Sequence, residues 1–358
     1  MKRFYALSFS MSFLQGLLVP VIVLYMLRLG YSEAEIGIIT GSSSLLYIVG
    51  ALLSSFIVSR LGDSKTIILS LNLLTAGYLL FLFSHSIVVI FIAASLVLLG
   101  FGIFWPSIEN AVSSVGGKVS SFSFSWSSGS LLAMASVYPL SLVEPAFTFL
   151  FFSGFSVFLV SFAIFSHKRR IEPATPAGIL GSLRKAAIAW LLCIIYSLNS
   201  SGLITFYPVL VEARKLPQIL LSATLFGMIF SRTLLFYLFE RVPNKLRRLD
   251  LAALLMLTPA LVVYTNDSLI HVSTALLSGI GQGIVYGIAL ERVFKRQSLE
   301  VHLYTSLFES FIGAGYFFGP MIGVGFSSLL RVQPIATTAF MSSVMALLAG
   351  LPLRRKES

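Results

Sequence analysis

The sequence contains little charge and a single cysteine. Only 11% of its 358 residues are charged and 57% are hydrophobic, whereas a soluble globular domain is about a quarter charged. Water could not cover so much apolar surface with so few charges, but lipid could. The one cysteine, Cys193, excludes an intrachain disulfide and a metal site of the cysteine type. We interpret it as a small buried hydrophobe.

Motifs for nucleotides, cofactors and zinc are also missing. The sequence has no Walker motif, no dinucleotide fingerprint and no His-Glu-x-x-His zinc motif, so we expect no cofactor and no ATP-driven step. Two classes of function are kept open. A membrane-embedded enzyme would need histidines and acids converging at one interface, and we find no such cluster. A membrane sensor would usually add a soluble domain. The four histidines lie near predicted helix ends or in loops, where interfacial positions are expected: His85, His167, His271 and His302.

Long apolar runs recur along the chain with short polar breaks. Each run approaches the roughly 20 residues that cross a bilayer core, and the runs are too continuously apolar for the alternation of a membrane β-barrel. The first run is longer than the core of a signal peptide, so we predict an uncleaved helix. The sequence predicts twelve transmembrane helices, at 4–28, 34–58, 65–84, 87–109, 119–141, 145–166, 186–210, 217–239, 248–265, 268–290, 301–328 and 334–352.

Positive charge is concentrated in alternate loops. With the N-terminus placed in the cytoplasm, the cytoplasmic segments hold all but five of the 25 Lys and Arg residues. This bias predicts that both termini of a multi-pass plasma-membrane protein are cytoplasmic. The net charge of +11 then reflects membrane loops, and no nucleic-acid partner is expected. The five exceptions are Arg28, Arg214, Lys215 and Arg331 in outer loops and Arg232 inside a helix.

The longest polar connection divides the predicted helices into six plus six. Residues 167–185 form a predicted cytoplasmic linker between an N-terminal bundle, 1–166, and a C-terminal bundle, 186–358. The two halves are weakly related in sequence. A Gly-Leu pair in the first helix and another in the seventh are separated by the same number of residues as Gly129 and Gly315. The expected fold is therefore an all-α integral membrane protein of two pseudo-symmetric six-helix bundles, which is a transporter architecture.

Residues 29–65 resemble the major facilitator superfamily. Leu29-Gly30-Tyr31-Ser32, followed by Ile36-Gly37, looks like the usual start of that family's second helix. The following loop is similar to the family motif Gly-x-x-x-Asp-Arg-x-Gly-Arg-Arg/Lys, although Ser59 stands in place of the aspartate and Asp63 in place of a basic residue. The family uses these charges to hold its inner gate closed. The resemblance therefore implies gate residues here at Ser59, Arg60, Gly62, Asp63 and Lys65.

Glycines in two later helices extend this resemblance. Gly100 to Pro106 also looks like the family's fourth helix. Gly315-x-x-x-Gly319-Pro320 resembles the antiporter motif, but the family places that motif in its fifth helix. The fifth helix here lacks Gly-Pro, which argues against a drug/proton antiporter. The resemblance implies a secondary transporter whose halves rock about a central site.

Two charged side chains fall inside apolar helices, where charge is costly and usually faces a cavity or a partner. Arg232 has five fixed donors that suit a carboxylate or phosphate, which predicts an anchor for an anionic substrate. The alternative is a structural arginine, with Glu240 nearby.

Glu309 is predicted to couple transport to protons, because burial disfavours the ionised form of a carboxyl. Its alternatives are a salt bridge to Arg232 or a place in an inner vestibule. We interpret Glu109 and Glu291, at helix ends, as gate or surface residues.

Several uncharged polar and aromatic residues lie on helices that the family uses to line its cavity. Each is assigned to substrate binding, with helix packing as the alternative: Gln15, Trp105, Asn199, Gln282 and Tyr286. Seven serines in 120–130 form a packing seam or a polar path, and the family's arrangement would place them opposite Arg232.

These residues predict a secondary active transporter that moves a small solute by alternating access, with a proton-coupled organic anion as the sharper hypothesis. The alternative is export of a neutral or amphipathic compound, with Arg232 purely structural. The expected partners are a small-molecule substrate, the lipid bilayer and protons, and the expected state is a monomer.

Overall fold

The computed structural model describes residues 1–83, 86–117, 119–164, 186–294 and 301–354, together with Gly181 and Leu183. Ten helices in these residues are long and apolar enough to cross a membrane. The predicted linker, 167–185, lies almost entirely outside the described residues, as do His85 and Lys118.

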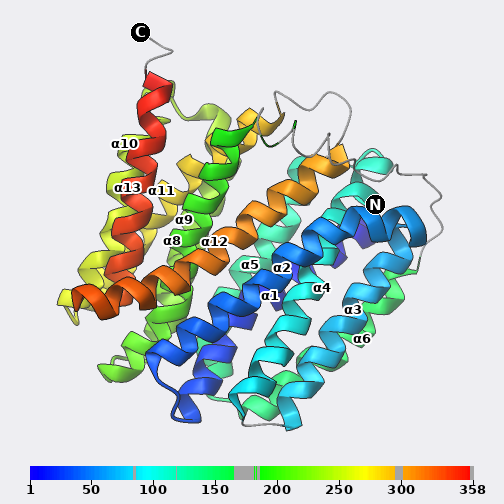
Figure 1. Ribbon diagram of the computed structural model, residues 1–358, viewed down its shortest axis with the longest axis horizontal. Helices are drawn as coiled ribbons and strands as arrows, with labels where there is room; N and C mark the ends of the chain where they lie inside the picture. The colour runs from blue at the N-terminus through cyan, green and yellow to red at the C-terminus, as the bar shows by residue number, and fades with distance from the viewer. Residues whose placement is uncertain are drawn as a thin grey trace.

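Within the described residues, six α-helices lie in 1–164 and six in 186–354 (Figure 1). The first half contains α1 (Lys2–Arg28), α2 (Glu33–Leu61), α3 (Asp63–Leu80), α4 (Ile87–Ser114), α5 (Val119–Ser141) and α6 (Pro145–Ala163). The second half contains α8 (Ala187–Ala213), α9 (Ile219–Leu238), α10 (Leu249–Leu257) with the 3-10 helix η4 (Thr258–Tyr264), α11 (Ser268–Phe294), α12 (Val301–Leu330) and α13 (Pro334–Arg354).

Local sequence explains where these helices begin and change. Ser32 begins α2 with a reciprocal cap, in which its backbone N–H donates to Glu35 Oε2 at 2.8 Å and its Oγ accepts from the Glu35 N–H at 3.3 Å. Gly62 separates α2 from α3 with φ of +79°, which favours glycine. Pro259 has no N–H to donate to the preceding turn, and α10 ends at Leu257, where the 3-10 helix η4 begins.

The two halves repeat the same helix neighbours. In the first half α1 packs on α5, α2 on α4, and α3 on α4 and α6. In the second half α8 packs on α12, α9 on α11, and α10 on α11 and α13. Gly129 of α5 and Gly315 of α12 occupy equivalent places, since a Cβ on either would collide with a backbone carbonyl of the partner helix, at Phe9 and Ile194 respectively. The predicted pseudo-symmetric bundles are confirmed.

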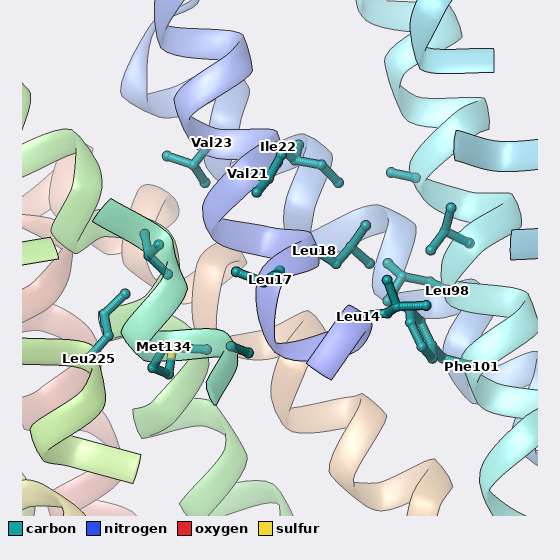
Figure 2. Packing of buried hydrophobic residues seen from close by; sticks show 14 of the residues in the cluster. Leu14, Leu17, Leu18, Val21, Ile22, Val23, Leu98, Phe101, Met134 and Leu225 are labelled. Carbon is teal, nitrogen blue, oxygen red and sulfur yellow. The ribbon is translucent and has the colours of Figure 1, made fainter. Parts of the chain in front are cut away.

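The halves meet mainly along α2 with α12 and α5 with α9. α1 begins and α13 ends at one end of the bundle, here called the terminal face, and the other end is called the opposite face (Figure 1). Toward the opposite face the halves share one apolar core, and Figure 2 shows Leu225 of α9 near Met134 of α5. Near the terminal face the second half has a separate core around Trp190, Leu249 and Leu303. The halves are therefore joined most continuously at the opposite face.

Candidate functional site

A cavity lies between the two halves and encloses about 1110 Å³ of empty space, its open mouth included. Its walls come from α1, α2, α4 and α5 of the first half and from α8, α9, α11 and α12 of the second. Among the described residues, three charged side chains line it: Glu109, Arg232 and Glu309. The mixture of aromatic and polar walls is typical of a small-molecule site.

Arg232 of α9 is 7% exposed and lines this cavity. Its Nη1 donates to Ser200 Oγ at 3.2 Å and to Gln282 Oε1 at 3.4 Å, while its Nε is buried without a hydrogen-bond partner. No ion pair to Arg232 occurs within the part of the chain that the structure describes. Glu240, the neighbour considered in the sequence, is exposed. The guanidinium therefore carries a charge without a carboxylate and has an unused donor.

A buried amide network lies behind Arg232. Asn199 Oδ1 accepts from Gln282 Nε2 and from Ser278 Oγ, each at 2.8 Å. Asn199 Nδ2 in turn donates to Met256 O at 3.0 Å and Ser342 Oγ at 2.8 Å. Asn199 and Gln282 are 2% and 0% exposed and are not among the residues that line the cavity.

This arrangement favours the packing alternative for Asn199 and Gln282, and their role in substrate binding stays a prediction. Their polar groups are used within the second half, where Gln282 holds the guanidinium of Arg232 and Asn199 holds Gln282. In this structure both amides are buried behind Arg232 and hydrogen-bonded within the second half. The sequence could not separate the two roles, because an amide in a membrane helix serves packing as well as binding.

Glu309 of α12 is 8% exposed and lines the cavity. Its Oε2 accepts a hydrogen bond from the hydroxyl of Tyr47 on α2, a bond that joins the two halves. Gly313 allows this approach, because a Cβ there would lie 2.7 Å from Tyr47 Cδ1. Glu309 does not pair with Arg232 in the described part of the chain. Glu309 is thus held by the first half of the molecule.

Glu109 lies in the same cavity, which the sequence interpretation missed. That interpretation placed Glu109 at the end of its helix, but α4 continues to Ser114. The side chain lines the cavity from the first half, while Glu309 lines it from the second. Two carboxyls and one guanidinium therefore share one enclosed space.

The remaining predicted binding residues, Gln15, Trp105 and Tyr286, line the cavity. Trp105 Nε1 donates to Gln15 Oε1, which fixes the indole. Tyr286 packs against Tyr196, with ring centroids 4.9 Å apart. Sequence reasoning missed four further aromatic residues of the wall, because no spacing separates them from packing aromatics: Tyr47, Trp126, Tyr196 and Tyr316.

The serines of α5 have mixed roles. Ser130 lines the cavity, and its hydroxyl lies 2.7 Å from that of Ser12. Ser125 donates to Tyr5 O and Ser128 to Phe124 O, so these two serve packing. α5 therefore serves mainly in helix packing, and Ser130 is the one serine of α5 among the described residues that lines the cavity.

The predicted gate motif lies at the α2–α3 junction. Asp63 is buried and accepts from Asn110 Nδ2 of α4 at 2.8 Å. Ser59 Oγ donates to Phe56 O. The guanidinium carbon of Arg60 lies 4.1 Å from the centroid of the Phe56 ring. The side chains of Arg60 and Lys65 are exposed. Asp63 thus ties the junction to α4, and the gate role of the motif remains a prediction. Among the described residues, no cluster of His, Cys, Asp and Glu could hold a metal ion.

The chain is similar to known transporters along its length. The model of the Major Facilitator Superfamily matches residues 4–296. No curated protein matches the chain. The solved nucleoside transporter NupG superposes with a TM-score of 0.73 at 14% identity, covering 99% of this chain and 98% of that one, and a mutant of it superposes with a TM-score of 0.75. A bacterial homologue of the human lysosomal transporter Spinster, inward-facing and unoccupied, superposes with a TM-score of 0.69 at 13% identity, covering 98% and 95%.

Proposed function

Because the chain belongs to the major facilitator superfamily, which makes it a transporter, we propose that it carries a small organic anion together with protons through the cavity between its halves. The observation that carries this proposal is Arg232, buried in the cavity wall with an unused donor and without an ion pair in the described residues. A buried charge without a partner is costly, and a substrate carboxylate or phosphate would supply the missing partner.

The two carboxyls in the cavity supply the coupling. If Glu109 and Glu309 are ionised, they repel an anion next to Arg232; if they bind protons, the repulsion disappears. Anion and proton therefore favour each other's binding. This mutual preference supports carriage of both in the same direction.

The Tyr47–Glu309 bond connects this proton to the motion of the halves. A hydrogen bond to an ionised carboxylate is roughly twice as strong as one between neutral groups. Protonation of Glu309 would therefore weaken a contact between α2 and α12. Release of that contact lets the two bundles, 1–166 and 186–358, rock against each other.

The side to which the cavity opens, and the orientation of the protein in the membrane, follow from the two apolar cores and from the loop charges. The continuous core toward the opposite face and the separate core near the terminal face support a cavity that opens toward the terminal face. The basic loops support a cytoplasmic position for that face. We propose a monomer in the plasma membrane with both termini in the cytoplasm.

A screen of the purified protein tests the substrate class. We expect one class among monocarboxylates, dicarboxylates and phosphate esters to raise the melting temperature, because ligands that bind only the folded state stabilise it. The shift should be larger at acidic than at alkaline pH, and the same anion should enter proteoliposomes when an inward proton gradient is imposed. Stabilisation only by uncharged compounds, such as a nucleoside, would favour the alternative in which Arg232 is structural.

A further inference from the structure

The cavity has an aromatic wall on each half of the molecule. Trp105 of α4 lines it from the first half, and Tyr196 of α8 and Tyr286 of α11 line it from the second. Within the described residues, no ring contact joins Trp105 to the two tyrosines, although each packs with rings of its own half. Trp105 and the two tyrosines therefore line the same cavity from opposite halves, while other rings join the halves directly, Trp126 with Phe236 and Tyr47 with Tyr316.

Arg232 lies at the edge of the second wall. Its guanidinium carbon is 5.7 Å from the centroid of Tyr196 and 6.0 Å from that of Phe236. Phe236 packs in turn on Tyr286 at 4.4 Å. The guanidinium thus lies beside the aromatic side chains of the second wall. A ligand ring that packs on the tyrosines would bring an acidic substituent to the guanidinium.

The aromatic wall of the first half is already fixed before a ligand binds. The indole of Trp105 donates to Gln15 Oε1, and Trp105 is 7% exposed. An immobilised ring loses little freedom when a ligand packs on it. A planar ligand ring that packs on both walls would contact both halves of the protein.

We propose that the substrate is an aromatic carboxylate, with its ring between Trp105 and the Tyr196–Tyr286 pair and its carboxylate on Arg232. This assignment rests on the proposed function, since it uses the same anion site. It adds that the ring itself is recognised. One aromatic contact corresponds to about a two- to tenfold gain in affinity over an aliphatic group of similar area.

Three matched probes test the ring and the charge separately: phenylacetate, cyclohexylacetate and phenylacetamide. The first two share a carboxylate and differ in ring aromaticity, and the third keeps the aromatic ring without the charge. Binding is measured by melting temperature and by tryptophan fluorescence in a Trp190→Phe protein. Of the three tryptophans, Trp190 does not line the cavity and stacks on Phe311 at 5.4 Å, so Trp105 and Trp126 then report from the cavity alone.

We expect phenylacetate to quench this fluorescence and to bind about tenfold more tightly than cyclohexylacetate, with phenylacetamide weaker than both. A Trp105→Leu, Trp126→Phe protein that keeps Trp190 should show no quenching. In Trp105→Leu the preference for phenylacetate over cyclohexylacetate should fall markedly, because only the Tyr196–Tyr286 wall remains, while Trp105→Phe, which keeps a ring, should retain it. The second variant also controls for misfolding, because it disturbs packing less.

Equal binding of phenylacetate and cyclohexylacetate, both lost in Arg232→Gln, would overturn the aromatic class and leave the anion site standing. Binding of phenylacetamide as tight as phenylacetate would overturn the anion site as well. Absence of binding by all three probes would also overturn the aromatic assignment, and the wider anion screen would then decide the proposed function.

Discussion

Anion binding and uptake are expected to be lost when Arg232 is replaced by glutamine. Removing one partner of a buried charge pair costs about 2–5 kcal/mol, so the dissociation constant should rise by roughly 30-fold or more. The free protein should be no less stable, because Arg232 has no ion pair within the described residues and a buried charge is replaced by a neutral group. Isothermal calorimetry and thermal unfolding of the purified protein measure both quantities.

Arg214 provides the matched control in the same half. It donates to Thr265 O at 3.1 Å and to Val263 O at the end of η4 and is not among the residues that line the cavity. Arg214→Gln should therefore lower the melting temperature and leave the dissociation constant unchanged. If Arg232→Gln instead unfolds the protein more easily and binds the anion normally, Arg232 is structural and the substrate must be held elsewhere.

Substitution of Glu309 by glutamine should stop accumulation of the anion against its gradient while exchange across the membrane continues. Glutamine resembles the protonated carboxyl and cannot release a proton, so the cycle is no longer driven by the proton gradient. Binding should also depend less on pH, because one of the two carboxyls that repel the anion is permanently neutral. Radiolabelled uptake and counterflow in proteoliposomes distinguish the two activities.

Glu240→Gln serves as the control for this experiment, because Glu240 is exposed beyond the end of α9 and is not a residue of the cavity wall. It should accumulate the anion as the unmodified protein does. Accumulation that persists in Glu309→Gln would remove Glu309 from the coupling path. Loss of exchange as well as accumulation would assign Glu309 to substrate binding.

The helices could be predicted from the sequence nearly to their ends, because a long apolar run has few alternatives in a membrane protein. α5, with its nine serines, is found at 119–141 as predicted. Arg232 and Glu309 could be singled out for a related reason, since a charge in an apolar run must face a cavity or a partner. The structure places both in one cavity.

The neutral members of the site could not be predicted in this way. Gln15 and Gln282 look alike in the sequence, yet one lines the cavity and the other is buried behind Arg232. The difference depends on how far each helix is rotated, which is set by contacts between helices. One such contact is at Gly279 of α11, where a Cβ would collide with Met228 O of α9. Glu109 was misplaced because α4 continues past the predicted end at 109.

Alternating access between the two halves is tested most directly by a disulfide across α2 and α12. A Cβ on Gly41 would lie 2.9 Å from Cγ of Met321, so Gly41→Cys with Met321→Cys places two sulfurs within bonding reach near the opposite face, in a Cys193→Ala background. The oxidised protein is predicted to bind the anion from the terminal face without carrying it, and reduction should restore transport. Each single-cysteine variant should be active throughout. Undiminished transport by the fully cross-linked protein would contradict the proposed mechanism.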